Sequence, residues 1–180
     1  MTGSMDEWTG PGPLDPVTFR PIGVIRTPFT DIEGMPIQPA AGAGIRGRIE
    51  LDPAFAEGLA DVDGFSHVIL LYHLHEVRTV KLTVTPFLDD RTRGIFATRA
   101  PTRPNPIGMS TVRVVAVGAS WIDIEDVDIL DGTPLLDMKP YVPAVDDRAD
   151  ARIGWYAGRL DRLPEARSDD RFRGERRGHL

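Results

Sequence analysis

The chain has 180 residues, which is enough for one domain with a hydrophobic core and short for two. It contains no cysteine, which excludes disulfide bonds, a thiolate nucleophile and a zinc–thiolate site, and no apolar run approaches the roughly 18 residues of a membrane-spanning helix. The net charge of −6 argues mildly against a nucleic-acid partner, and the N-terminus has no secretory-signal pattern, so we expect a cytoplasmic protein without a membrane partner.

Glycine and proline divide the chain into three parts. Residues 1–16 are rich in both, which predicts a disordered N-terminal tail, and residues 164–180 are mostly charged, which predicts a disordered C-terminal tail. Residues 17–163 between them have the short β-branched runs of one folded domain. Its predicted strands span, in chain order, residues 19–27, 45–51, 65–75, 81–86, 94–98, 111–117, 121–129 and 135–141.

Helix contributes little to this pattern. Asp52 and Pro53 suit the start of a short helix that ends at Leu59, and residues 152–163 are compatible with a terminal helix despite two glycines. The continuous apolar run within residues 65–75 indicates a strand buried on both faces. Many short strands with few short helices predict an all-β fold, a closed or nearly closed β-barrel.

Dinucleotide-binding folds do not fit this sequence. It shows no alternation of strand, helix and strand, and no Gly-rich turn leads from a strand into a helix. A nucleoside cofactor would therefore bind in a different geometry.

A stiff and basic loop follows residues 94–98. Three prolines lie within residues 101–106, and each restricts its own backbone and that of the residue before it. The loop therefore holds Arg99, Arg103 and Asn105 in fixed directions, as a site for an anionic or carboxylate-bearing ligand requires. The same rigidity also suits a plain connector between strands.

Charge is distributed unevenly along the chain. Residues 78–113 have seven Lys and Arg against two Asp, whereas residues 123–150 have nine Asp and Glu against two Lys and Arg. A local basic face is compatible with RNA binding despite the acidic total. Ordinary solvated surface explains the same pattern equally well.

Five ordered motifs give the chain its resemblance to a known family. They are PIGVIRTP (21–28), GFSHVILL (64–71), GIFATR (94–99), RPNPIGMS (103–110), and DILDGTP (128–134) followed by DMKPYVP (137–143). The sequence resembles the TsaA-like or TrmO family, whose members transfer a methyl group from S-adenosylmethionine (SAM) to threonylcarbamoyladenosine beside the tRNA anticodon. The resemblance implies a TsaA-like SAM-binding barrel, tRNA (its anticodon stem-loop) as partner, and a homodimer with the pocket near the subunit contact.

The resemblance also implies the residues that bind the cofactor. Ile37 with Met35 would cover the adenine, the Gln38 amide would bond a base edge, and Arg99 would bind the donor's carboxylate. The full set of implied cofactor-binding residues is Pro36, Ile37, Gln38, His75, Glu76, Arg99, Met109, Glu125, Asp126, Val127, Asp128 and Asp131.

Several of these residues have plainer interpretations. Arg99 would serve equally as a structural residue that ties its loop to a carbonyl. His73 and His75 share a strand face without a third clustered ligand, so we expect no metal site, and buried histidines of this kind commonly satisfy their neighbours. Glu125 and Asp126 fit a solvated strand face as well as a cofactor rim.

Methyl transfer to a urea-like nitrogen requires that a proton leave, and the sequence identifies no base. We assign catalytic roles to Arg103 and Asn105, which would stabilise developing negative charge or grip the substrate's carboxylate. Two alternatives to a tRNA methyltransferase stay open: a SAM-dependent methyltransferase of a small molecule, and a non-catalytic SAM-binding module.

Overall fold

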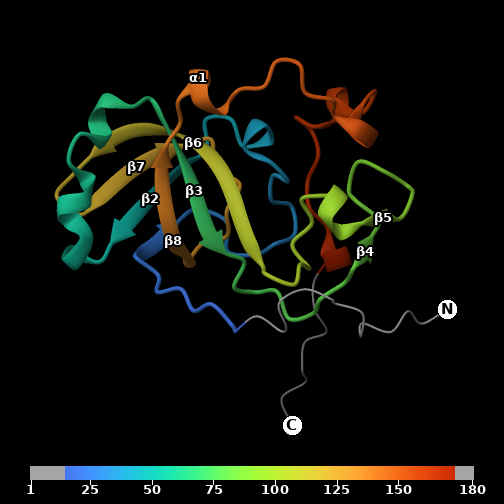
Figure 1. Ribbon diagram of the computed structural model, residues 1–180, viewed down its shortest axis with the longest axis horizontal. Helices are drawn as coiled ribbons and strands as arrows, with labels where there is room; N and C mark the ends of the chain where they lie inside the picture. Colours follow the sequence, from blue (N-terminus) through green and yellow to red (C-terminus); the bar gives the residue numbers. More distant parts are fainter. Residues whose placement is uncertain (1–14, 173–180) are drawn as a thin grey trace, which may run out of the picture.

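Six antiparallel strands form a closed barrel in the order β1-β2-β7-β6-β3-β8, within residues 15–172 that the computed structural model describes (Figure 1). Barrel closure pairs both edges of the sheet, so the strand ladders have no open side. The predicted all-β barrel with few short helices is confirmed. Its strands are β1 (Gly23–Arg26), β2 (Arg46–Leu51), β3 (His67–His73), β6 (Ile107–Val117), β7 (Trp121–Glu125) and β8 (Thr133–Pro140).

The barrel interior is filled by aliphatic side chains from every strand. Ile25, Ile49, Leu70, Ile122 and Leu135 have no exposed surface. The prediction that β3 is buried on both faces is wrong, because its burial alternates from residue to residue. Alternate side chains of a strand point to opposite faces, and only one face of a barrel strand meets the interior.

A small second unit lies beside the barrel (Figure 1). It pairs β4 (Thr83–Val84) with β5 (Arg93–Gly94), and β4 is shorter than the predicted strand over residues 81–86. The predicted strand over residues 94–98 is wrong, since η4 (Ile95–Ala97) is a 3-10 turn there. The Thr98 backbone N–H and hydroxyl both donate to the Ile95 carbonyl, at 3.1 and 2.9 Å, and thereby close that turn.

Other helical segments are short. The predicted helix over residues 152–163 is wrong, because Gly154 and Gly158 take positive φ angles of 55° and 72° and interrupt it. The described part of the chain contains no helix long and apolar enough to cross a membrane. The remaining short helices are η1 (Pro39–Ala41), η2 (Pro53–Leu59), η3 (Val62–Gly64), α1 (Pro143–Asp146), η5 (Gly154–Tyr156), η6 (Leu160–Arg162) and η7 (Asp170–Phe172).

Residues 164–172, which we name the C-terminal strap, pack on the rest of the protein and differ from the disordered tail expected there. The Ser168 amide donates to the Met35 carbonyl at 2.8 Å, and Gly34 donates to the Ser168 carbonyl at 2.9 Å. Phe172 is only 9% exposed and meets Phe87 edge to face at 5.1 Å. These contacts hold the strap against the rest of the protein although many of its residues are charged. Most of the predicted N-terminal tail lies outside the described residues.

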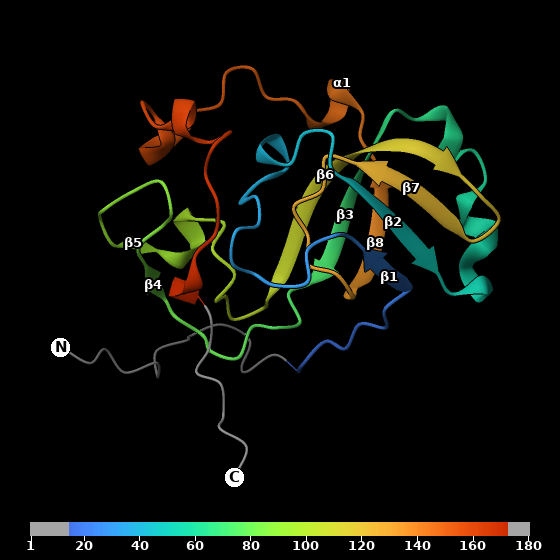
Figure 2. The ribbon, with the colours of Figure 1, turned by 180° about the vertical axis from the view of Figure 1, so that it is seen from behind.

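The strap and the loop of residues 27–45 join the two units. Figure 2 shows this loop, in blue, between the barrel and the β4–β5 unit. Its end is anchored at the barrel, where the Gly44 amide donates to Asp126 at 2.8 Å. The space between the units is therefore enclosed by irregular segments of the chain.

Asp52 begins η2, as predicted, by accepting a hydrogen bond from the Ala54 amide at 3.0 Å. We expect Asp52→Ala to lower the free energy of unfolding by about 1 kcal/mol, because the first turn loses its cap. Urea unfolding measures this change. Glu57→Ala in the same helix is the control, and an equal loss there would show that the cap is not responsible.

Candidate functional site

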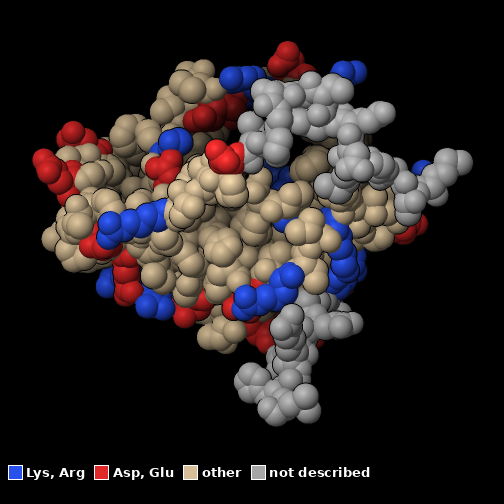
Figure 3. Space-filling model, turned by 60° about the horizontal axis from the view of Figure 1, so that its bottom comes forward, with Lys and Arg blue, Asp and Glu red and all other residues tan. Residues whose placement is uncertain are grey.

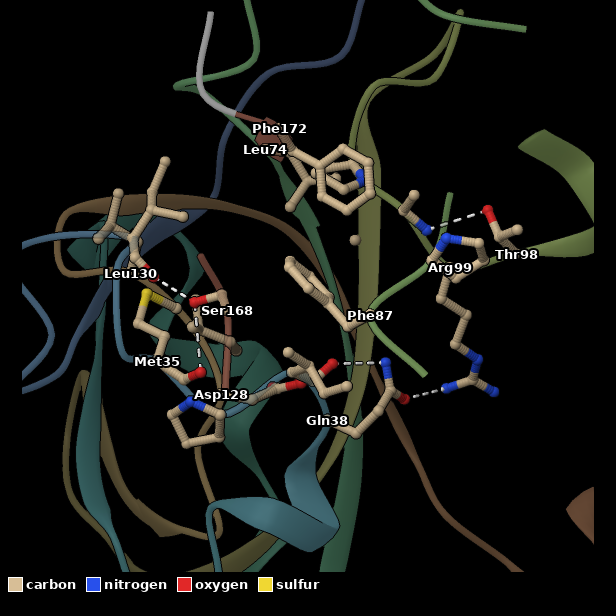
Figure 4. Close-up of a pocket in the computed structure, with 18 of the residues that line it drawn as sticks. Met35, Gln38, Leu74, Phe87, Thr98, Arg99, Asp128, Leu130, Ser168 and Phe172 are labelled. Atoms are coloured by element: carbon tan, nitrogen blue, oxygen red, sulfur yellow. Dashed lines mark hydrogen bonds between the residues drawn. The ribbon is translucent and has the colours of Figure 1, made fainter. Parts of the chain in front are cut away.

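A cavity of about 380 Å³ opens between the barrel end and the β4–β5 unit (Figure 4). This volume lies within the range of roughly 300–1,000 Å³ that is typical of small-molecule sites. Its walls come from the end of β3, the start of β6, the loop of residues 27–45, the proline-rich loop of residues 99–106 and the C-terminal strap. Among the apolar residues of the lining are Met35, Ile37, Leu74, Phe87, Ile129 and Leu130.

Arg99 and Gln38 form a polar pair on one wall of this cavity. Arg99 Nη1 donates to Gln38 Oε1 at 3.0 Å, and Gln38 Nε2 donates to the Ile37 carbonyl at 2.7 Å (Figure 4). The first bond fixes the amide so that its oxygen faces the guanidinium. Arg99 is exposed and retains further donors for a carboxylate ligand.

Asp128 lies at the base of the cavity between the Gln38 side and the Met35 side (Figure 4). Its Oδ1 accepts a hydrogen bond from the Ser110 hydroxyl at 2.7 Å, and Ser110 Oγ lies 2.9 Å from Tyr72 Oη. Burial raises the pKa of Asp128 to about 6, although the Ser110 hydroxyl and the nearby Arg99 charge act in the opposite direction. Burial also raises the pKa of the Tyr72 hydroxyl well above its usual value, so it stays protonated.

Gly108 makes this arrangement possible. It pairs with Tyr72 across β3 and β6, and a Cβ atom at Gly108 would lie 2.1 Å from the Tyr72 ring. The missing side chain lets the ring cross over β6 toward Ser110. The glycine of the RPNPIGMS motif thus serves close packing inside the cavity wall.

Arg103 lines the cavity but is already engaged by the protein. Its Nη1 donates to the Thr98 carbonyl at 2.9 Å and to the Ile95 carbonyl at 3.3 Å. Its guanidinium carbon also lies 5.8 Å from the centre of the Phe96 ring. The structural role that the sequence offered for Arg99 therefore fits Arg103, which braces η4.

Nine of the fourteen predicted site residues line this one cavity. They are Pro36, Ile37, Gln38, His75, Glu76, Arg99, Arg103, Met109 and Asp128. His75 Nε2 lies 3.7 Å from Glu76 Oε1, so these two neighbours contact each other. Segments far apart in the sequence thus meet at this cavity.

The other five predicted residues lie outside the cavity lining. The carbonyl of Asn105 accepts from the Ile107 amide, and Val127 is fully buried in the barrel core. Glu125 pairs with Arg46 at 3.0 Å on the exposed surface. Two acidic side chains instead accept hydrogen bonds from the backbone: Asp126 from the Gly44 amide, and Asp131 from the Thr27 amide at 3.0 Å.

Sequence reasoning missed the aromatic and C-terminal parts of the lining. Tyr72 shares the inward face of β3 with Val68 and Leu70, so its alternation with them was an available signal. No pattern marked the strap, because its residues read as a charged tail. The missed lining residues include Tyr72, Phe87, Trp155, Tyr156, Leu163, Ser168, Asp169 and Phe172.

We expect Asp128 to make the protein less stable as the pH rises from about 4 to about 6. Burial raises the pKa of the folded carboxyl from its ordinary value of 3.8 to about 6, so the folded state binds this proton more tightly. Its stabilising contribution is therefore present below about pH 4 and is lost as the pH rises through the folded pKa. Urea unfolding across this range should show Asp128→Asn gaining stability relative to the unaltered protein.

Asp123→Asn is the matched control for this measurement. The Arg48 guanidinium, 2.6 Å from Asp123, lowers the pKa of that carboxyl, so its stabilising contribution is present above about pH 4 and the stability difference for the control should be nearly constant across this range. A stability difference for Asp128→Asn that does not change with pH would contradict the shifted pKa.

The donor set of the cavity fits a zwitterionic nucleoside better than a metal ion. In the described residues, no group of three or more His, Cys, Asp or Glu could hold a metal. A guanidinium, an amide and a carboxylate are instead set around an apolar lining, as an adenosine with an amino-acid tail would require. Fold and cavity are those of a β-barrel with a candidate small-molecule site outside the barrel end.

The sequence matches the family described as tRNA-methyltransferase O N-terminal domain over residues 24–147, and the chain belongs to this family. A probable S-adenosyl-L-methionine-binding protein of Pyrococcus abyssi is 50% identical over 156 residues, which cover 87% of this chain and 85% of that protein. The tRNA (adenine(37)-N6)-methyltransferase of Escherichia coli is 34% identical over 76% of this chain and 63% of its own length.

Solved structures agree with the fold. The crystal structure of TrmO from Pseudomonas aeruginosa matches with a TM-score of 0.67 and 40% identity, over 78% of this chain and 63% of that chain. This chain therefore spans less than two thirds of that TrmO. The predicted family and barrel are both confirmed.

Proposed function

We propose that the protein is a SAM-dependent methyltransferase that acts on N6 of threonylcarbamoyladenosine beside the anticodon of tRNA. The observation that carries this proposal is the cavity, where Arg99, Gln38 and Asp128 face an apolar space in a chain of the TrmO family. The similar proteins named as SAM-binding or as tRNA methyltransferases support the same cofactor and substrate. With tRNA as its substrate, the enzyme would act in the cytoplasm.

The cavity offers a separate position for each part of SAM. Arg99 suits the carboxylate of the methionine moiety through charge-assisted hydrogen bonds. Met35 and Ile37 offer apolar contact to the adenine, and Gln38 offers an amide to its edge. Holding donor and acceptor in line is a large part of what such an enzyme must supply.

The tRNA would bind to a surface of mixed charge. Figure 3 shows Lys and Arg interspersed with Asp and Glu around a central area formed by other residues. We expect phosphate contacts on such a surface to be few and local, and the affinity for tRNA therefore to depend only moderately on salt.

A homodimer is part of the proposal. Five large hydrophobic side chains between residues 80 and 109 are 40% to 76% exposed. Several exposed hydrophobic residues within one short stretch of the chain suggest a contact surface more than isolated ones do. They are Val80, Leu82, Phe96, Ile107 and Met109, and the last two also line the cavity. A second subunit that packed on Ile107 and Met109 would lie beside the cavity that these two residues line.

Mass spectrometry of nucleosides from tRNA tests the proposed function. The tRNA would come from cells that make threonylcarbamoyladenosine but do not methylate it. It would be incubated with the protein and isotope-labelled SAM. We expect a labelled methyl group on threonylcarbamoyladenosine. SAM binding without transfer to any RNA would instead support a binding module, and transfer only to a small molecule would support the other methyltransferase.

A further inference from the structure

The chain Tyr72–Ser110–Asp128 is a hydrogen-bond relay whose direction follows from its chemistry. Ser110 has one hydroxyl proton, which it donates to Asp128 Oδ1 at 2.7 Å. The 2.9 Å contact with Tyr72 must then be donated by the Tyr72 hydroxyl. Two hydroxyl donors in series therefore end on one carboxylate.

The relay has little purpose in holding the barrel together. Ser110 and Tyr72 are 2% and 6% exposed, and both belong to paired strands whose backbone bonds do not need these hydroxyls. Asp128 follows β7 and lines the cavity, where burying a carboxylate is costly. A charge kept at such a cost and oriented by two donors indicates a functional group.

We propose that Asp128 is the proton acceptor of the methyl-transfer reaction and that Ser110 and Tyr72 are positioning residues that keep it ionised. This inference rests on the proposed function. It supplies the base that the sequence did not identify, and it gives Asp128 a role other than contact with the cofactor.

The step balances in atoms and charge. A bound sulfonium donor supplies the methyl group and takes back the electron pair of the broken C–S bond. The acceptor nitrogen forms the new N–C bond, its N–H bond breaks, and the proton passes to the Asp128 carboxylate. One positive and one negative charge become neutral products, which an apolar cavity favours over separated charges.

Other charged and titratable groups line the same cavity as Asp128 and come from several elements. Arg99, from the proline-rich loop, favours the ionised carboxylate, and burial opposes it. Loss of the Ser110 donor should therefore raise the pKa of the carboxyl. The groups that share its cavity are Tyr72 from β3, His75 and Glu76 after β3, Arg99 and Arg103 from the loop, Tyr156 from η5 and Asp169 from the strap.

Three variants of the full chain test the proposal: Asp128→Asn, Ser110→Ala and the matched control Asp123→Asn on the barrel surface. Single-turnover methyl transfer to tRNA is measured at saturating SAM across pH 5–9, and affinity for S-adenosylhomocysteine is measured by calorimetry. We expect Asp128→Asn to slow transfer by about 10²- to 10⁴-fold, as loss of a general base does. Its affinity for S-adenosylhomocysteine should stay within about tenfold of the unaltered protein.

The relay has its own readouts, which do not depend on turnover alone. In Ser110→Ala the acidic limb of the pH–rate profile should move to higher pH, with the rate recovered on the alkaline side. Carbon-13 NMR of the Asp128 carboxyl should show the same upward shift in the protein without substrate. The Asp123→Asn control should change neither measurement.

The outcomes separate this inference from the proposed function. If the unaltered protein methylates tRNA and Asp128→Asn does so within tenfold of its rate, with weakened cofactor binding, Asp128 is a cofactor contact and the inference is wrong. A pH profile that Ser110→Ala leaves in place contradicts the relay. If the unaltered protein methylates no tRNA, the proposed function fails and this step fails with it.

Discussion

Replacing Arg99 with alanine is expected to weaken binding of S-adenosylhomocysteine by about 10- to 100-fold. A hydrogen bond to a charged group contributes roughly 1.5–3 kcal/mol, and each 1.4 kcal/mol corresponds to a tenfold change in affinity. Arg99 is oriented by Gln38 at 3.0 Å and would bind the ligand's carboxylate. The guanidinium fork matters here, so Arg99→Lys should recover only part of the loss.

A ligand without the carboxylate makes this prediction specific. Methylthioadenosine keeps the adenosine and the sulfur but lacks the amino-acid end, so Arg99→Ala should change its affinity by less than about threefold. Arg91→Ala, an exposed arginine outside the cavity lining, is the control for general charge effects. Calorimetry that finds both ligands weakened equally would show that Arg99 shapes the site without meeting the carboxylate.

Much of the barrel could be predicted because its strands carry local signals. The β-branched run of residues 111–117 in β6, the β-branched residues of β7 and the alternating residues of β2 form strands within the ranges that the sequence indicated. The segments beside the barrel were harder. Ile95 is a residue type that is typical of strands, yet the Thr98 hydroxyl donates a hydrogen bond to its carbonyl and closes a turn instead. Residue type alone does not decide between a strand and such a local hydrogen bond from a threonine hydroxyl.

Part of the cavity lining could be predicted where the family resemblance supplied residues, and none of it where packing alone decides. Gln38, Arg99 and Asp128 belong to three distant segments, and only the family resemblance placed them together. The same resemblance gave Asp131 a cofactor role, whereas the structure shows it accepting a hydrogen bond from the Thr27 amide. An acid that caps a loop and an acid that faces a ligand look alike in sequence.

The second substitution with a large expected effect lies in the C-terminal strap. Phe172 packs against Phe87 and joins a small cluster with Val84, Ile95 and Ala100, separate from the barrel core. Truncating a buried Phe to Ala costs about 3–5 kcal/mol. Because this cluster holds the strap and not the barrel, we expect Phe172→Ala to open the strap while the barrel stays folded.

Hydrogen exchange at the Ser168 amide measures that opening directly. This amide donates to the Met35 carbonyl at 2.8 Å, so it exchanges only when the strap leaves the loop of residues 27–45. We expect its protection to fall by about 10²-fold or more in Phe172→Ala, as a cost of about 3 kcal/mol requires. Phe19→Ala, at a position 61% exposed, should leave it unchanged.

Cofactor affinity shows whether the strap belongs to the site or only covers it. Leu163 and the strap residues Ser168, Asp169 and Phe172 line the cavity, so an open strap removes part of the wall that a nucleoside would contact. Phe172→Ala should therefore weaken binding of S-adenosylhomocysteine and of methylthioadenosine alike, unlike Arg99→Ala. Full affinity for both ligands with an open strap would mean that barrel and loops form the site by themselves, and that the strap serves stability alone.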